Sequence, residues 1–522
     1  MFELRALLLL RSAPERTLHR FVLFLVMALV LRSAALAFGI LDIDEAHWTL
    51  IGRLLSEGAT PYVDVSDHKP PLLFYVFALF GAATGGSLAG QVLLMMAYVA
   101  STATLLSLAA RRLGADAQGA FMGGWAYLVL TTCNVITVNS ELLSELPVAA
   151  GLLVLAGGFT PGRLFACGVL AGLAPLLRPQ AAIFAVAVGV VCAWQLFGLR
   201  ARGAWRTLLA FVAGCALPVA ATLTLFAAAG LLAPFWEWNV TRNLGYPAPA
   251  GWVWLALTEG GIFLIFAQGW AWAAAYRPCL EALRGLRARD PRLLPAALVL
   301  PVLLLLAVLA VGAGRRFYSH YFLQTALPLS LLAGPRIASL WRDARLCGQA
   351  GRARLFAAAV AVPLLVFFAA HWGRGALGHY PSQDPQVAAI AEFLRGPSAP
   401  PGPIAVWGDP SHLYLYANRR PASRFYNAAP LVGNFDSNHV ADDFDVASHV
   451  SHADVATYIA DLERNRAAIL VDTSSARMHF WQRFALERVP QLREYVARTF
   501  TLGATVAGAR LYFRQAPRAP SP

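Results

Sequence analysis

The sequence predicts a polytopic α-helical membrane protein that ends in a small soluble α/β domain. Hydrophobic residues make up 58% of the 522 positions and charged residues only 14%, and the mean hydropathy is +0.56. A soluble protein carries about a quarter of its residues as Asp, Glu, Lys and Arg. Apolar stretches recur to about residue 371, whereas 13 of the 29 acidic residues fall in 372–522. We therefore expect a membrane domain over 1–371 and a separate domain over 372–522.

The apolar stretches predict about eleven transmembrane helices, because roughly twenty apolar residues cross a bilayer as a helix. The expected crossings are 21–41, 88–110, 117–138, 142–160, 163–177, 180–198, 207–231, 251–275, 293–313, 321–340 and 355–371. The segment 71–83 is apolar but shorter, so we expect a juxtamembrane or re-entrant helix there.

The basic residues predict the orientation of these crossings. Of the 42 basic residues only Lys69 is a lysine, so no P-loop is present, because that motif needs a lysine after glycine. With a cytoplasmic N-terminus, most arginines fall on inner loops: Arg5, Arg11, Arg16, Arg20, Arg111, Arg112 and those within 200–206, 277–292 and 342–354. The net charge of +13 is therefore mainly an orientation signal and not a nucleic-acid footprint. An odd number of crossings leaves 372–522 on the outer face.

The segment 372–522 predicts a small α/β domain. Strands are expected at 404–408, 467–472 and 508–513, and helices at 452–465 and 482–498. The segment has no cysteine, and none of the six cysteines elsewhere forms a C-x-x-C pair, so zinc and redox sites are weakly supported. We assign Trp407, Asp409, Tyr414 and Tyr416 to its core and turns rather than to a binding surface.

The first outer loop, 42–87, carries the densest acidic cluster: Asp42, Asp44, Glu45, Glu57, Asp64 and Asp67. Apolar residues at helical spacing follow Asp44 up to Gly58 and predict an amphipathic helix at the membrane surface. An N-cap role would account for Asp44 alone. It leaves unexplained the second cluster, in which Asp67 precedes His68, Lys69 and two prolines. A lysine at the membrane edge suits a lipid phosphate, so acid and base together favour a substrate whose leaving group is a phosphate.

These residues resemble the first outer loop of bacterial GT-C glycosyltransferases. The shared pattern is D-E before the amphipathic helix, G-x-x-P-Y-x-D over 58–64, and K-P-P-L from Lys69. The similar proteins are the family 39 relatives of protein O-mannosyltransferases, the lipid A aminoarabinose transferase and the Rgt-type core-sugar transferases. The resemblance implies that Asp44 is the catalytic base with Glu45 as its neighbour, and that Lys69 meets the phosphate of a polyprenyl-linked donor. His47 stands where some relatives have an arginine.

Further outer-face residues are candidates for the same site. Glu145, the stronger of the pair Glu141 and Glu145, matches a second acid of the similar proteins, and Arg178 matches a basic residue that approaches the phosphate. The loop 312–328 adds three expected phosphate ligands, Arg315, Arg316 and His320, and two expected substrate contacts, Tyr318 and Tyr321. The first outer loop adds three more expected substrate contacts: His47, Asp67 and His68. Two charges inside crossings, Arg32 and Glu259, are expected to face a cavity or a partner.

The expected function is an inverting transfer of a hexose or pentose from a polyprenyl-phosphate donor to lipid A, core glycan, another lipid or a protein at the periplasmic face of the bacterial inner membrane. A divalent ion at Asp44 and Glu145 stays open, and no other cofactor is expected. A transporter or flippase of lipid-linked sugars is the alternative, although no paired halves are evident. A non-catalytic assembly protein would leave the pairing of Asp44 with Lys69 unexplained.

Overall fold

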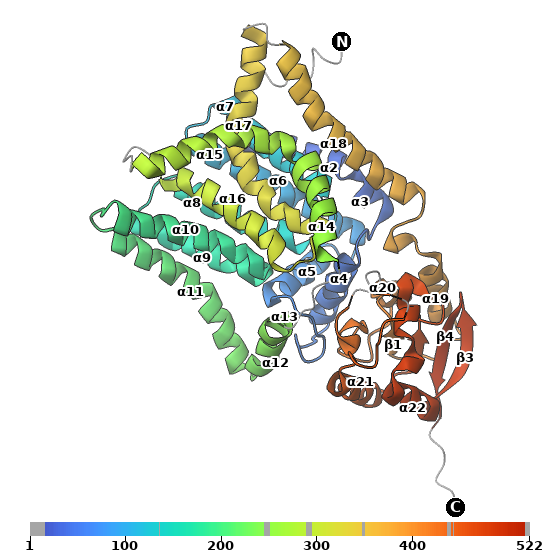
Figure 1. Ribbon diagram of the computed structural model, residues 1–522. Helices are drawn as coiled ribbons and strands as arrows, with labels where there is room; N and C mark the ends of the chain where they lie inside the picture. The colour runs from blue at the N-terminus through green and yellow to red at the C-terminus, as the bar shows by residue number, and fades with distance from the viewer. Residues whose placement is uncertain are drawn as a thin grey trace, which may run out of the picture.

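The structure is a computed structural model that describes residues 16–134, 136–244, 251–288, 295–346, 350–435, 440–441 and 443–516. Its helical body contains α2 (Thr17–Leu31), α3 (Ser33–Phe38), α6 (Leu88–Arg112), α7 (Ala117–Asn134), α8 (Ser140–Leu155), α9 (Pro161–Leu177), α10 (Ile183–Ala193), α11 (Ala204–Ala228), α14 (Trp252–Gly260), α15 (Gly269–Ala288), α16 (Pro295–Ala313), α17 (Leu323–Leu346) and α18 (Ala350–Ala376). A smaller unit with a sheet lies at one end of this body (Figure 1).

The membrane character of the body is confirmed, but the number of crossings stays a prediction. Each expected crossing falls on one or more helices. Among the described residues, five helical segments are long and apolar enough to cross a bilayer: Leu88–Arg112, Pro179–Gly198, Ala204–Ala228, Pro295–Ala313 and Gly351–Arg395. A sixth would be Trp252–Ala267 with Gly269–Ala288, two helices bent by 73°. Of the arginines expected in the cytoplasm, Arg5, Arg11, Arg289 and Arg292 lie outside the described residues.

Glycines let two neighbouring helices, α9 and α11, approach closely. A Cβ atom added at Gly214 would lie 2.2 Å from the carbonyl oxygen of Phe165, and one at Gly168 would lie 2.3 Å from that of Phe211. Small residues at such crossings allow backbone-to-backbone packing, which stabilises helix pairs in lipid. The pair α9–α11 therefore depends on the absence of side chains at these positions.

The first outer loop folds into α4 (Ile43–Ser56) and α5 (Pro71–Ala83), as the apolar spacing predicts. The N-cap is Asp42 and not Asp44, because the carboxylate of Asp42 accepts the backbone N–H of Asp44 at 2.9 Å. Trp48 packs edge-on against Phe77 of α5 at 5.8 Å between ring centroids, and Trp48 is buried. The apolar face of α4 therefore packs on protein.

The C-terminal unit, 381–516, contains α19 (Pro385–Arg395), β1 (Ile404–Trp407), α20 (His412–Ala417), α21 (His452–Arg464), β2 (Ile469–Asp472), α22 (Pro490–Thr499), β3 (Phe500–Val506) and β4 (Ala509–Arg514). The strand order is β1-β2-β4-β3, with β1 parallel to β2 and the other pairs antiparallel. The expected strands and the helix at 452–465 are confirmed. The expected helix at 482–498 is wrong in its first half, where two short 3-10 helices, Met478–Phe484 and Leu486–Arg488, precede α22. The edge strand β3 was not predicted.

The C-terminal unit docks on the first outer loop. Ser66 donates its backbone N–H and its hydroxyl to the carbonyl oxygen of Arg424, at 3.1 and 3.0 Å. A second outer segment follows α12 (Leu232–Trp236) and includes α13 (Arg242–Leu244). There Arg242 forms two bonds with Asp454 of α21, at 2.6 and 3.0 Å. These contacts hold the C-terminal unit over the end of the helical body where α4 and α5 lie (Figure 1).

Candidate functional site

A cavity of about 550 Å³ lies where the first outer loop, the helical body and the C-terminal unit meet. Nine of the residues singled out from the sequence line it: Asp44, His47, Asp67, His68, Lys69, Arg316, Tyr318, His320 and Tyr321. The other four, Glu45, Glu145, Arg178 and Arg315, do not. A cavity of this size holds a sugar and a phosphate group.

Asp44 is in the first turn of α4 and faces this cavity. Its side chain is about one-third exposed, and within the described chain its only ion-pair partner is His47, at 3.9 Å between Oδ1 and Nδ1. Since Asp42 caps the helix, the carboxylate of Asp44 is not used by the α4 backbone. A partly exposed carboxylate in a cavity is placed to accept a proton from a bound hydroxyl group.

Glu45 lies on a different side of the same helix. Its carboxyl group is buried and accepts the backbone N–H of Leu41 at 3.2 Å. Burial raises the pKa of Glu45 to about 8. Consecutive residues of an α-helix point about 100° apart, so only Asp44 of the pair reaches the cavity. The catalytic role expected for Glu45 has no support from this geometry.

His47 joins α4 to the C-terminal unit. Its Nε2 atom lies 3.4 Å from Oδ1 of Asp409, and its ring meets that of Tyr426 edge-on at 5.1 Å. Burial favours the neutral imidazole, but the carboxylates of Asp409 and Asp44 outweigh it and raise the pKa of His47 to about 9. A positive charge is therefore present beside Asp44 at neutral pH.

Lys69 brings a second positive charge to the cavity. Its ammonium group lies 5.9 Å from the centroid of the Trp48 ring, and no described carboxylate lies within ion-pair distance of it. Its backbone N–H donates to Asp67 at 2.9 Å, and its carbonyl accepts the hydroxyl of Tyr62 at 2.8 Å. Burial and the nearby ammonium lower the pKa of His68 to about 4, so His68 is neutral. The ammonium of Lys69 is therefore available to an anionic ligand.

The loop before α17 contributes the opposite wall. The buried guanidinium of Arg316 donates to the hydroxyl of Tyr318 at 3.3 Å, and the rings of His320 and Tyr321 meet edge-on at 4.8 Å. Arg315 is exposed and stacks on Trp252 at 5.4 Å, outside the cavity. Of the two arginines of this loop that were expected in phosphate binding, only Arg316 lines the cavity with Lys69.

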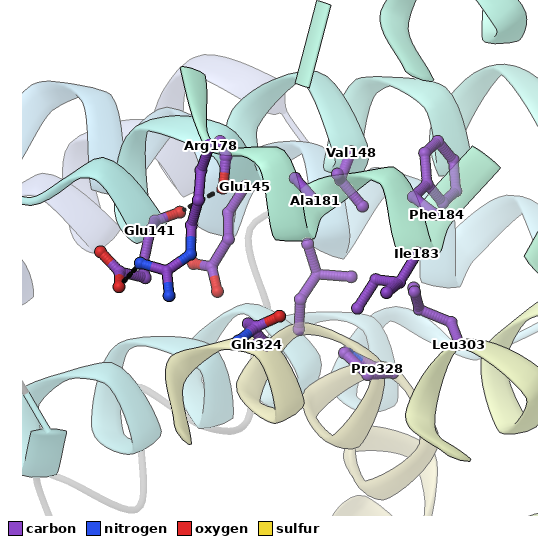
Figure 2. A pocket seen from close by; sticks show the side chains of 12 residues that line it. Glu141, Glu145, Val148, Arg178, Ala181, Ile183, Phe184, Leu303, Gln324 and Pro328 are labelled. Carbon is purple, nitrogen blue, oxygen red and sulfur yellow. Dashed lines mark hydrogen bonds and ion pairs between the residues drawn. The ribbon is translucent and has the colours of Figure 1, made fainter. Parts of the chain in front are cut away.

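Arg178 lies next to this wall but not in the cavity. It is buried and forms an ion pair with Glu141 (Figure 2). The Oε1 atom of Glu141 also lies 3.6 Å from Nε2 of His320. Arg178 and Glu141 are at the polar end of a second, mostly apolar pocket of about 30 Å³, roughly the volume of one water molecule. Glu145 also lines this pocket and accepts the hydroxyl of Tyr127 at 2.5 Å. Arg178 is thus connected to the cavity through Glu141 and His320, and its contact with phosphate stays a prediction.

A metal site finds little support in this arrangement. Asp44 and Glu145, the acids considered for a divalent ion, line different pockets. Among the residues that the structure describes, no group of three or more His, Cys, Asp and Glu side chains is arranged to hold a metal ion. Asp44 and Glu145 therefore do not share a metal site in the part of the chain that the structure describes.

Several cavity residues were not predicted, and eight of the lining residues come from the C-terminal unit. Asp409, which we assigned to a turn, pairs with His47 and lines the cavity with Tyr426, Asn427 and Trp481. The only signal in the sequence was the position of Asp409 just after a strand, where binding residues are common. Trp407 and Tyr414 are buried in the core, as predicted. Glu259, an acid within an expected crossing, lines the cavity, as its cost in lipid predicts.

Comparison with known proteins identifies the architecture. No protein-family model and no curated sequence matches the chain. Among solved structures, the chain is similar to ArnT from Cupriavidus metallidurans bound to undecaprenyl phosphate, with a TM-score of 0.60, 18% identity, and coverage of 96% of this chain and 99% of that one.

A second similar protein is the archaeal oligosaccharyltransferase AglB from Archaeoglobus fulgidus, in complex with an inhibitory peptide and a dolichol-phosphate. The TM-score is 0.55 and the identity 14%, with coverage of 97% of this chain and 75% of that one. Its apo form gives a TM-score of 0.53 at 12% identity. Both similar proteins agree with the resemblance carried by the first outer loop, and the chain has the fold of the GT-C glycosyltransferases.

Proposed function

We propose that the protein is an inverting glycosyltransferase that moves a sugar from a polyprenyl-phosphate carrier to a cell-envelope acceptor. The observation that carries the proposal is that the Asp44 carboxylate and the Lys69 ammonium line one cavity. Transfer from a phosphate leaving group needs a proton acceptor for the nucleophile and a cation for the departing phosphate. The bound undecaprenyl phosphate and dolichol-phosphate of the two similar proteins support a donor of this class.

The residues then take distinct roles in one displacement. An acceptor hydroxyl attacks the anomeric carbon of the donor sugar from the face opposite the phosphate. Asp44 takes the hydroxyl proton as the new carbon–oxygen bond forms. The bond between the anomeric carbon and the phosphate oxygen breaks, and its electron pair leaves with the phosphate. Lys69 and Arg316 stabilise the negative charge of the departing phosphate.

The site is proposed to face the periplasm of a bacterium, with 1–371 in the inner membrane and 372–522 outside it. The arginine distribution supports this orientation. The end of α17 and the start of α18, where the arginines of 342–354 cluster, lie at the end of the body remote from the C-terminal unit (Figure 1). A polyprenyl-linked donor presented at the outer face would therefore meet Asp44 and Lys69.

Complementation of a deletion strain tests the proposal. We expect the deletion to remove one sugar from an envelope molecule, as measured by mass spectrometry, and wild-type protein to restore it. Asp44→Asn keeps the side-chain shape but not the base, so transfer should fall by about 10²- to 10⁴-fold. Asp64→Asn is the matched control, because Asp64 is an exposed acid of the same loop that does not line the cavity.

Two results would reject the proposal. Full restoration by Asp44→Asn would remove the base assignment. The deletion strain could instead accumulate a lipid-linked sugar on the inner face of its membrane while another enzyme still carries out the transfer. That result would favour the alternative, a transporter of that lipid.

A further inference from the structure

The walls of the cavity differ in whether they carry permanent cations. The permanent cations that line it, Lys69 and Arg316, come from the first outer loop and from the loop before α17. The described residues that the C-terminal unit contributes to the lining include one carboxylate, Asp409, and no lysine or arginine. The two sides therefore suit different ligands: an anion on the membrane side, and an uncharged or weakly polar group on the other.

The wall from the C-terminal unit offers hydrogen-bond donors beside aromatic rings. Oδ1 of Asn427 accepts the backbone N–H of Ala429 at 3.1 Å, which fixes the amide and leaves its NH₂ group as a donor for the cavity. Trp481 is 2% exposed and lines the cavity, and its indole N–H has no acceptor among the described residues. A buried donor without a partner is costly, so an oxygen brought by a ligand would stabilise it. Phe435 adds an aromatic ring to the same wall.

Phosphorylated or carboxylated groups are disfavoured at this wall. Asp409 and Asp44 both approach His47, so one imidazolium faces two carboxylates. An additional anion next to them would be repelled, and no described cation of this wall would offset that repulsion. Hydroxyl groups, in contrast, can accept from Asn427 and from Trp481, while the C–H face of a sugar ring packs on an aromatic ring.

We propose that Asn427, Phe435 and Trp481 form the acceptor subsite and that its ligand is an uncharged saccharide unit whose hydroxyl group is the nucleophile. This inference rests on the proposed glycosyl transfer and names its acceptor class. The donor phosphate then occupies the side of Lys69 and Arg316, and the saccharide the side of the C-terminal unit, with Asp44 lining the same cavity.

Steady-state kinetics of the purified full-length protein test the subsite. The probes are the envelope glycan extracted from the deletion strain as acceptor and polyprenyl-phosphate-linked sugar from the same strain as donor. Asn427→Asp keeps the oxygen that Ala429 binds and removes the amide donor. Phe435→Leu removes the ring. For each variant we expect the KM for the acceptor to rise about 5- to 150-fold and the KM for the donor to stay within about twofold of wild type.

Phe480→Leu is the matched control, because Phe480 is a half-exposed aromatic residue of the same unit that does not line the cavity. Its kinetics should equal those of wild type. Melting temperatures of all variants identify a variant that fails through unfolding. Tandem mass spectrometry of the product then identifies the residue that receives the sugar, which should be a saccharide without phosphate or carboxylate.

The inference and the proposed function fail in different ways. If wild-type protein transfers no sugar, the proposed function fails. If wild-type protein transfers sugar but the variants at Asn427 and Phe435 keep the wild-type KM for the acceptor, or raise only that for the donor, the subsite is wrong. A receiving residue that carries phosphate or carboxylate, or that is not a saccharide, would overturn the assignment of acceptor class.

Discussion

The hydroxyl of Tyr426 joins the C-terminal unit to the loop that carries Lys69. It donates to Oδ2 of Asp67 at 2.7 Å, and both residues are buried. The other carboxylate oxygen of Asp67 accepts the backbone N–H of Lys69 at 2.9 Å. Tyr426→Phe removes the hydroxyl without changing the ring, and it leaves one oxygen of a buried carboxylate without its donor.

The size of the effect follows from the charge on the acceptor. A hydrogen bond to a charged group contributes about 1.5–3 kcal/mol. For a unit of this size one kcal/mol changes the melting temperature by roughly 3 °C, so Tyr426→Phe should melt about 5–9 °C below wild type. The loop of Lys69 loses one of its anchors, so we also expect a weaker affinity for the donor.

Tryptophan fluorescence during heating in detergent measures this change, since Trp407 and Trp481 are buried in the C-terminal unit. Tyr416→Phe is the matched control, because the Tyr416 hydroxyl has no hydrogen-bond partner among the described residues, and it should melt within about 1 °C of wild type. Unchanged melting of Tyr426→Phe, or an equal fall in Tyr416→Phe, would refute the role assigned to this bond.

Three further variants test other parts of the structure. Lys69→Ala should raise the KM for the donor about 10- to 100-fold, because one charged hydrogen bond to the donor is lost, and Lys69→Arg should recover part of this loss. A KM for the donor that is unchanged in Lys69→Ala would show that Lys69 does not bind the donor. The pKa of His47 is raised to about 9, so its charged form is present below that pH and is lost as pH rises through it. Asp409→Asn should lower this pKa and move the alkaline fall in the rate–pH profile to lower pH, whereas an unmoved profile would contradict the ion pair. Gly214→Ala should destabilise the protein by about 1–3 kcal/mol in thermal melting, while Gly189→Ala, where an added Cβ meets nothing within 4 Å, should not.

The sequence predicted those parts of the site that lie within one local segment. The spacing of apolar residues after Asp44 predicted α4, and the two prolines after Lys69 predicted the start of α5. The local pattern also placed Asp44 and Lys69 in one loop, and in the structure this loop forms one wall of the cavity. It could not separate Asp44 from Glu45, because which side of a helix faces a cavity depends on its neighbours.

Contacts between distant segments could not be predicted from one sequence. Asp409 follows β1 as an ordinary turn residue, and only docking of the C-terminal unit brings it to His47. The partner of Arg178 was equally hidden, since Glu141 belongs to the start of α8 and Arg178 to the end of α9. In both cases the pairing depends on how segments distant in the sequence pack together, which a single sequence does not show.

The docking of Tyr426 on Asp67 has a consequence for biosynthesis. The two residues are 359 positions apart, so nearly the whole body must be synthesised and inserted before the second arrives. Until then the loop with Asp44 and Lys69 faces only the wall formed by the loop before α17, and the side that the C-terminal unit covers is open to water. An unfinished chain would therefore leave a bound sugar exposed to water, because the segment that covers this side of the cavity is synthesised after the helical body.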